Sequence, residues 1–434
     1  MFKIFFKSQI ARKTILSFLL KIFQALFSFT TTVLLARMLG AKGYGIYAYA
    51  FAFVTLFSIP VQIGLSQLII RETAKGIAKK RPEVIKGIWY WAIRIGIFSS
   101  LVLLICIGTI FAFLKRNEFG LEETFFWALL LVPIFIFSNI WGASLRGLHK
   151  IITGQLPEFI IRPGLFLIFL CIINFIFHKN LTPSQAMVLQ VAAAVIALII
   201  GGGLFFRNIP SFVYSACPSY EGNKWFNSLL PLTFVAGMWM INSHIDIVIL
   251  GIFKSPFEVG IYRIASQLAL LSSFALQAVN IVIAPHIAGL YAKREMDKLQ
   301  HLATRSARTV LTFNLLVAIF FLSFGKIFIN LLFGKEFVWA YIPLLILLGG
   351  QLINSATGSV GFLLNMTGHE RDSSWGMTLA AGINIVLNFF LIPLLGAKGA
   401  AIATAVSMIT WNIVIWWLVR KRLGINSLAF SLSN

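Results

Sequence analysis

Apolar runs long enough to cross a bilayer as helices occupy most of this 434-residue chain. A helix that spans the hydrocarbon core needs about 20 predominantly apolar residues. Twelve runs meet this requirement, and they predict an all-α, polytopic membrane protein. Their approximate cores are 14–36, 44–70, 88–114, 124–145, 157–177, 186–206, 229–253, 258–283, 309–333, 338–365, 376–395 and 399–419. The longest gap between them, near 284–308, is too short for a water-soluble domain.

The large positive charge follows the expected membrane topology. The formal net charge is +22, which in a soluble protein would favour nucleic-acid binding. With the N-terminus in the cytoplasm, however, most Lys and Arg residues fall in cytoplasmic segments, such as 71–86, 293–308 and 420–422. This asymmetry is the positive-inside pattern of membrane proteins. It predicts a multi-pass protein of a bacterial or archaeal plasma membrane with both termini in the cytoplasm, and it argues against nucleic acid as a partner.

The cysteines do not indicate a metal or redox site. The chain has three, Cys106, Cys171 and Cys217, and none has a partner at the spacing of a metal ligand pair or a redox motif. Small apolar filling is the favoured role for such residues. We therefore expect no metal, no cofactor and no catalytic residue.

Two short sequence echoes indicate an internal duplication. The tripeptide Gly-Ile-Tyr occurs at 45–47 and again at 260–262, in each case at the start of a predicted outward-to-inward helix. A second echo joins 147–150 with 368–371. Together they predict two six-helix lobes, 1–212 and 213–434, joined by a linker at 207–224. Because six is even, the lobes would share one orientation and enclose a central cleft.

Two segments carry a resemblance to a known family. The sequence Leu-Ala-Arg-Met-Leu-Gly at 35–40 is followed by Tyr-Gly-Ile-Tyr at 44–47, and 384–393 forms a second signature before Gly396 and Gly399. Both resemble polysaccharide flippases of the O-antigen (Wzx) type, in the multidrug/oligosaccharidyl-lipid/polysaccharide exporter superfamily. Asp246, shortly before Gly251, is similar as well. The resemblance implies a MATE-like exporter fold, alternating access and export of a lipid-diphosphate-linked oligosaccharide for polysaccharide synthesis, as in lipopolysaccharide. It does not identify the sugar.

Five charged side chains lie within the predicted spans: Lys21, Arg94, Arg162, Arg263 and Asp246. A charge at membrane depth costs at least about 2.5–3.5 kcal/mol on insertion scales, so it usually serves a function. Four cations and one carboxylate favour a polar cavity that receives an anion. Arginine suits this purpose because its planar guanidinium binds two phosphate oxygens at once.

Each of these charges also has a structural alternative. Lys21 and Arg94 lie about two turns from the cytoplasmic ends of their helices, so cavity lining and snorkelling to the interface are equally compatible with the sequence. Arg162 follows Glu158 by four residues, a spacing that favours an ion pair within the helix.

Asp246 and Arg263 lie at similar depth on either side of the turn near residue 254. They are predicted to pair across this hairpin, as a structural ion pair in preference to a switch operated by a proton or the substrate. Both roles predict intolerance to removal of one partner. His244, two residues before Asp246, is predicted to be a hydrogen-bonded neighbour, with a proton relay as the alternative.

The span at 258–283 has a polar stripe. Its members follow spacings of three and four residues, which place them on one helix face: Arg263, Ser266, Gln267, Ser273, Gln277 and Asn280. In a membrane this face must contact protein or a wet cavity. We predict that it forms a wall of the substrate cavity, with Gln267, Gln277 and Asn280 beside the cations. For Asn384 and Asn388, hydrogen bonding between helices is the expected role.

The resemblance implies a flippase that moves a lipid-diphosphate-linked oligosaccharide, with a polyprenyl tail, from the inner to the outer leaflet, and the buried cations and the polar stripe suit such a substrate. The membrane potential would favour outward movement of the anion, and H⁺ or Na⁺ antiport through Asp246 is an alternative or additional driving force. A multidrug or cation exporter would favour an acidic cavity. A membrane polysaccharide polymerase or glycosyltransferase would need a large outward loop with a catalytic acid or base, and the outward loops here are short.

Overall fold

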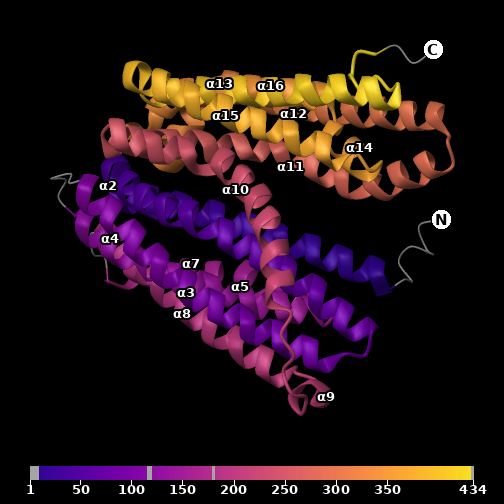
Figure 1. Cartoon of the computed structure of the whole chain (residues 1–434). Helices are drawn as coiled ribbons and strands as arrows, with labels where there is room; N and C mark the ends of the chain where they lie inside the picture. Colours follow the sequence, from indigo (N-terminus) through magenta and orange to yellow (C-terminus); the bar gives the residue numbers. More distant parts are fainter. Residues whose placement is uncertain (1–8, 115–119, 178–180, 432–434) are drawn as a thin grey trace. The chain divides into compact units, whose positions relative to one another are not determined.

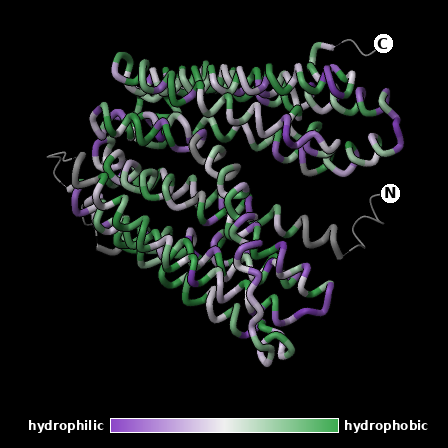
Figure 2. Tube along the Cα trace, viewed as in Figure 1, coloured by the Kyte–Doolittle hydropathy of each residue, from purple (hydrophilic) through white to green (hydrophobic). Residues whose placement is uncertain are grey.

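The protein is described by a computed structural model over residues 9–114, 120–177 and 181–431, where every regular element is a helix (Figure 1). Ten of these helices are long and apolar enough to cross a membrane. Along them the residues are largely hydrophobic, and hydrophilic residues gather toward the helix ends and turns (Figure 2). The chain is therefore a multi-pass membrane protein.

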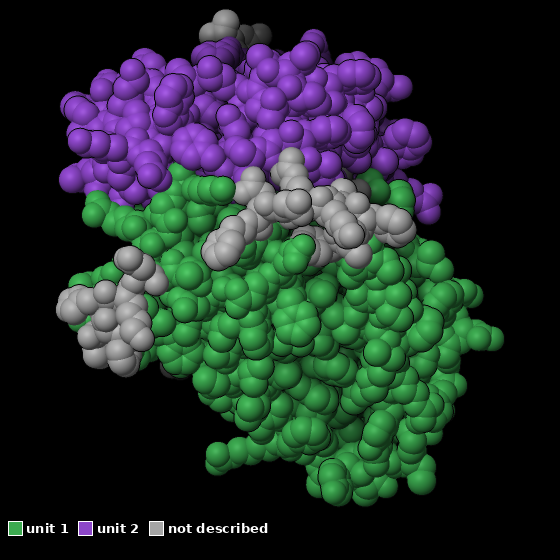
Figure 3. Space-filling view, turned by 90° about the vertical axis from the view of Figure 1, so that its left-hand side faces the viewer, with its two compact units in different colours: residues 1–240 green, residues 241–434 purple. Residues whose placement is uncertain are grey.

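Two compact units divide the chain after residue 240, within α10 (Figure 3). In unit 1, the long α2 packs against α3, α5 and α7. Its elements are α2 (Gln9–Ala78), α3 (Pro82–Leu114), α4 (Leu121–Leu129), α5 (Leu131–Gly147), α6 (Ile151–Leu156), the π-helix η1 (Pro157–Ile161), α7 (Arg162–Ile172), the π-helix η2 (Ile173–Phe177), α8 (Pro183–Arg207), α9 (Ser211–Tyr214) and the first part of α10 (Gly222–Phe253).

Unit 2 begins in the last part of α10, and its α16 packs against both α13 and α15. An apolar core that includes Ile287, Leu299, Leu364 and Val419 joins α11, α12, α14 and α16. The other elements of this unit are α11 (Pro256–Ala292), α12 (Met296–Phe333), the 3₁₀ helix η3 (Lys335–Ala340), α13 (Tyr341–Thr357), α14 (Val360–Met366), α15 (Glu370–Leu395) and α16 (Ala397–Leu423).

Glycines with positive φ break the helices at two places, one between two predicted spans and one inside a predicted span. The predicted spans 14–36 and 44–70 both lie in α2, and Gly40 separates them with φ 66° and ψ 179°. The predicted span 338–365 ends early, because Gly358 adopts φ 74° between α13 and α14. Glycine reaches such positive φ values without a Cβ penalty. The gap near 284–308 is mostly helical, since α11 continues to Ala292 and α12 begins at Met296.

The segment 207–224, predicted as a linker, is anchored on the first turns of α3. Lys86 Nζ donates hydrogen bonds to the carbonyl oxygens of Tyr214 and Ala216 at 2.6 and 2.8 Å. The backbone N–H of Ser219 donates to the carbonyl of Glu83 at 2.9 Å. After the linker, the fully buried Trp225 packs edge-on against Trp91 of α3, with ring centroids 5.7 Å apart. This linker is therefore a docked part of unit 1.

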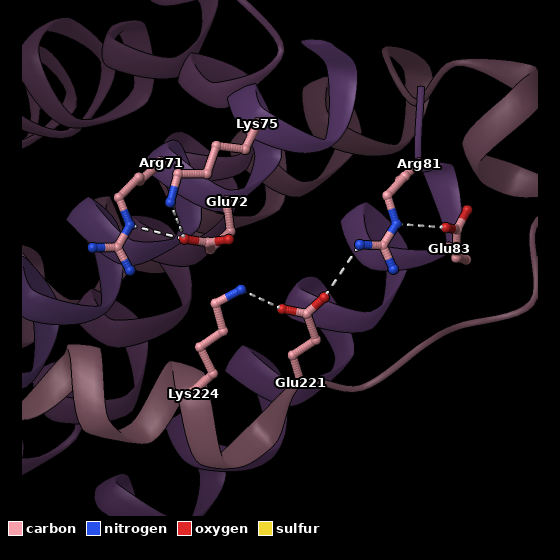
Figure 4. A network of polar contacts seen from close by, with 7 residues as sticks. All are labelled: Arg71, Glu72, Lys75, Arg81, Glu83, Glu221 and Lys224. Carbon is pink, nitrogen blue, oxygen red and sulfur yellow. Dashed lines mark hydrogen bonds and ion pairs between the residues drawn. The ribbon is translucent and has the colours of Figure 1, made fainter. Parts of the chain in front are cut away.

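Ion pairs reinforce the docking (Figure 4). Glu221 accepts from Lys224 at 3.0 Å and from Arg81 at 3.4 Å, and Arg81 also pairs with Glu83. A hydrogen bond from the Lys224 ammonium lowers the pKa of the Glu221 carboxyl below its usual value. Because this group is ionised more readily in the folded protein, its small contribution to stability is present at neutral pH and is lost as the pH falls through that lowered pKa.

Replacing Gly87 with alanine should loosen this linker. A Cβ at position 87 would lie 1.9 Å from the carbonyl oxygen of Ser219, so the linker backbone would have to move. We expect a loss of about 1–3 kcal/mol in stability, the usual cost of such overpacking, measured by thermal unfolding in detergent. Gly108→Ala in the same helix is the control, because no atom lies within 4 Å of its added Cβ. Equal unfolding temperatures for the two variants would contradict the docked geometry.

Candidate functional site

One buried carboxylate joins four helices of unit 2. Asp246 of α10 is 4% exposed, and its Oδ2 accepts hydrogen bonds from the Tyr262 hydroxyl of α11 and the Thr404 hydroxyl of α16, both at 2.6 Å. Its Oδ1 accepts from Asn388 Nδ2 of α15 at 2.5 Å. Asn388 Nδ2 also donates to Asn384 Oδ1 at 3.0 Å. We call these five residues the Asp246 cluster.

The predicted ion pair between Asp246 and Arg263 is wrong. Among the ion pairs of the described residues, none joins these two side chains, and the hydrogen-bond donors to Asp246 are neutral. Equal depth along the hairpin was a sound expectation, but it ignored rotation about α11: the residue that turns toward Asp246 is Tyr262, which is only 2% exposed. Arg263 is half-buried and acts electrostatically on His244, whose Nδ1 has no hydrogen-bond partner among the described atoms.

The Asp246 cluster offers oxygen ligands. Carboxylate, hydroxyl and amide oxygens suit a proton or a hard cation such as Na⁺ better than a transition metal. Asn388 Oδ1 is buried without a hydrogen-bond donor among the described residues, which leaves an acceptor beside the carboxylate. Within the described ranges no three His, Cys, Asp or Glu residues come together as metal ligands. The cluster is therefore a buried carboxylate held by three neutral hydrogen-bond donors from three other helices.

A second charged group lies in unit 1. Arg162 begins α7, directly after the π-helix η1, and its guanidinium carbon lies 4.7 Å from the centre of the Phe135 ring on α5. The predicted ion pair with Glu158 is not among those of the described residues, although the charge of Glu158 still acts on Arg162. The π-helix explains the difference: its wider turn removes the i, i+4 alignment that an α-helix would give.

The structure adds Arg146 to this group. It lies in the last turn of α5, half-buried, with a buried Nε that has no acceptor among the described residues. Glu158 acts electrostatically on Arg146 as well. Sequence reasoning missed Arg146 because the predicted span ended at residue 145. The matching echo at 147–150, which marks the end of this helix, was the signal that could have placed Arg146 inside the last turn.

Lys21 and Arg94 have different environments. Lys21 is exposed on α2, one turn after Ser17, whose hydroxyl donates to Gln155 Oε1 at 2.7 Å. This contact places Lys21 on the part of α2 that lies beside α6 and η1. Arg94 of α3 lies over the Tyr220 ring of the docked linker, 5.3 Å from its centre. The structure therefore leaves Lys21 exposed on α2 and places Arg94 beside the linker.

The polar stripe of α11 is present but uneven. Gln267 is half-buried, and Gln277 is exposed and donates to Ser273 of its own helix at 3.2 Å. Asn280 is 7% exposed, and its Oδ1 has no donor among the described residues. Its role as a cavity wall stays a prediction for Gln267, Gln277, Asn280 and Arg263.

Comparison with known proteins identifies the family. The sequence profile of a family described as "Polysaccharide biosynthesis protein" matches residues 10–291. The chain belongs to this family. The resemblance to polysaccharide flippases of the exporter superfamily is thereby confirmed. This polysaccharide biosynthesis family member is 24% identical over 403 residues to a Haloferax volcanii protein described as "Probable low-salt glycan biosynthesis flippase Agl15", covering 92% of this chain and 81% of that protein.

Solved structures establish the fold of this family member. A MATE-family multidrug resistance transporter in an inward-facing conformation superposes with a TM-score of 0.76 at 14% identity, covering 92% of this chain and 94% of the other. The lipid II flippase MurJ in an inward closed conformation superposes with a TM-score of 0.73 at 12% identity, covering 94% and 87%. At these identities the likeness shows the fold alone, and that fold is the helical exporter architecture predicted from the sequence.

Proposed function

We propose that this protein is a flippase, without enzymatic activity, that carries a lipid-diphosphate-linked oligosaccharide from the inner to the outer leaflet. In this proposal twelve spans form two six-helix lobes, 1–212 and 213–434, with both termini in the cytoplasm. The lobes alternate between openings to the two sides of the membrane. Family membership and the flippase named among the relatives support this direction of function.

The observation that carries the proposal is the set of cations at membrane depth without an ion-pair partner among the described residues. The guanidinium carbon of Arg162 lies 4.7 Å from the centre of the Phe135 ring, and Arg162 donates no hydrogen bond among the described residues, so its planar N–H groups are available to a ligand. Such groups bind phosphate oxygens in a bidentate manner. A diphosphate between a lipid and a sugar is an anion that must pass this depth of the membrane.

The membrane potential supplies the proposed driving force. A unit charge crossing the full field gains about 2.3 kcal/mol per 100 mV. A diphosphate of charge near −2 that leaves a negative interior would thus gain roughly 4–5 kcal/mol per 100 mV. Asp246 is the proposed site at which H⁺ or Na⁺ assists the return of the empty lobes, with His244 beside it.

Two other functions fit less well. A multidrug exporter that binds cations needs acidic groups, whereas Arg146, Arg162 and Arg263 outnumber the carboxylates near them. The fold likeness to a multidrug transporter does not decide between the two, because fold alone does not specify the substrate. A polymerase or glycosyltransferase needs a catalytic acid or base, and the relative reported above is described as a flippase.

The test is translocation in proteoliposomes that contain the full chain and a lipid-diphosphate oligosaccharide with a terminal sugar that a soluble lectin recognises. We expect protein-dependent appearance of the sugar at the outer face, faster with an imposed inside-negative potential. Vesicles without protein and vesicles with Arg263→Gln are compared, and the arginine variant should be slower. Absence of protein-dependent translocation contradicts the function. Transport that ignores the potential but follows a pH gradient contradicts the proposed driving force.

A further inference from the structure

Close helix contact in unit 1 brings several polar side chains into one region. Gly142 of α5 and Gly154 of α6 touch so closely that a Cβ on either would lie 2.6–2.7 Å from the carbonyl oxygen of the other. On α5, Phe135, Asn139 and Arg146 share one face with Gly142, since they are spaced by four and seven residues. The facing segment carries Glu158 and Arg162 beyond Gly154. The glycine contact therefore sets the two polar faces against each other.

Several hydrogen-bond donors in this region have no acceptor among the described residues. Gln62 of α2 is 5% exposed, and its Oε1 accepts from Asn139 Nδ2 at 3.0 Å, while its own Nε2 is buried without a partner among the described residues. Arg146 Nε is likewise buried without a hydrogen-bond acceptor among the described residues. The guanidinium carbon of Arg162 lies 4.7 Å from the centre of the Phe135 ring, and Arg162 donates no hydrogen bond among the described residues. Buried donors without acceptors are costly, so each instance calls for a ligand or a functional reason.

Glu158 supplies the negative charge of this region. It acts electrostatically on both Arg146 and Arg162, yet no ion pair among the described residues joins it to either. It is one turn beyond Gly154, and Arg146 lies beside Gly154: a Cβ on that glycine would meet Arg146 Cγ at 3.0 Å. The order along the two helices is thus Arg146, Glu158, Arg162, with the carboxylate between the two cations.

We propose that Gln62, Arg146, Glu158 and Arg162, the arginine cluster, form a binding site for a phosphoester anion. Gln62 and the two arginines donate to phosphate oxygens, and Glu158 is a resident counter-anion that partly compensates the arginines when the site is empty. Because Glu158 repels a bound phosphate, it also speeds release. This inference rests on the proposed function, since the phosphoester it assigns is the diphosphate of the lipid-linked substrate.

Binding to the purified full chain in nanodiscs tests the site. The probe is a short-chain polyprenyl diphosphate, titrated by calorimetry into nanodiscs of neutral lipid. We expect Arg146→Gln to weaken binding at least tenfold and Glu158→Gln to tighten it several-fold. The matched controls are Arg207→Gln, at the exposed end of α8, and Glu123→Gln, exposed in the first turn of α4; both should bind as the unchanged protein does. Equal affinities for Arg146→Gln and Arg207→Gln would overturn the site, as would weaker binding by Glu158→Gln.

A competition arm distinguishes the source of the phosphoester. Phosphatidylglycerol is added to the nanodiscs, and inorganic diphosphate is titrated in a parallel series. Retention of polyprenyl diphosphate binding in the presence of phosphatidylglycerol supports a substrate site, whereas full competition assigns the site to bilayer lipid and overturns the substrate assignment. Proteoliposome transport separates the two proposals. Normal flipping by Arg146→Gln would contradict this binding site but not the flippase function. Binding of the probe by the unchanged protein without any translocation would contradict the flippase function but not the binding site.

Discussion

Replacing Asp246 with asparagine should reduce lipid-linked oligosaccharide flux in proteoliposomes roughly 10–100-fold. The variant keeps the shape of the side chain but removes the one charged group of the Asp246 cluster, and hydrogen bonds to a charged group contribute about 1.5–3 kcal/mol. If a cation at Asp246 helps to reset the lobes, the neutral variant loses that step. Flux is measured at a fixed potential and fixed protein content.

The structure separates this role from a purely structural one. Asparagine can still accept from Tyr262 and Thr404 through one oxygen, so Asp246→Asn should unfold within a few degrees of the unchanged protein. Asp246→Ala removes both acceptor oxygens that four helices share, and its unfolding temperature should fall clearly. Asp297→Ala, exposed at the start of α12, is the control for loss of a carboxylate. Normal flux in Asp246→Asn would show that the carboxylate is only a structural acceptor.

Replacing Arg162 with glutamine should lower flux by about one to two orders of magnitude, because a charge-assisted hydrogen bond to phosphate contributes about 1.5–3 kcal/mol. The effect should be on transport and substrate affinity more than on stability. Arg162 donates no hydrogen bond within the described structure, and its cation–π contact with Phe135 contributes only on the order of 1 kcal/mol. The readouts are translocation rate, its dependence on substrate concentration, and thermal unfolding.

The conservative variant makes the test specific. Arg162→Lys keeps the positive charge but lacks the planar donor pair, so its flux should lie between that of Arg162→Gln and that of the unchanged protein. Arg207→Gln, with the same loss of charge at an exposed helix end, should transport normally. If Arg162→Gln and Arg207→Gln transport equally well, Arg162 does not bind the diphosphate.

Hydropathy was sufficient to predict the helical membrane fold, because continuous apolar runs of about 20 residues match a spanning helix, which satisfies its own backbone, and are too long for a spanning strand. It did not predict where helices break without a loss of hydrophobicity. Gly358 interrupts the predicted span 338–365 through its backbone conformation, whereas the break at Gly40 falls where the sequence separated two predicted spans. The π-helix at 157–161 likewise has no hydropathy signal.

The sites were only partly predictable for a related reason. The sequence indicated which residues were costly to bury, and Asp246 and Arg162 do lie in polar clusters. Partners across helices depend on the rotation of each helix, and sequence spacing gives this rotation only within one helix. Tyr262, Thr404 and Asn388 could not be assigned to Asp246, because they come from three other helices. Arg146 was missed because the predicted span ended at residue 145, one residue before it, and so placed Arg146 outside the helix.

The central claim is that the protein translocates a lipid-linked sugar by binding its diphosphate. Two substrates that share the polyprenyl tail and the oligosaccharide, one linked through a diphosphate and the other through a neutral ether, test this claim directly in the same proteoliposomes. We predict that the diphosphate substrate is translocated at least tenfold faster and that Arg162→Gln removes most of this preference. Equal translocation rates for the two substrates would contradict the account.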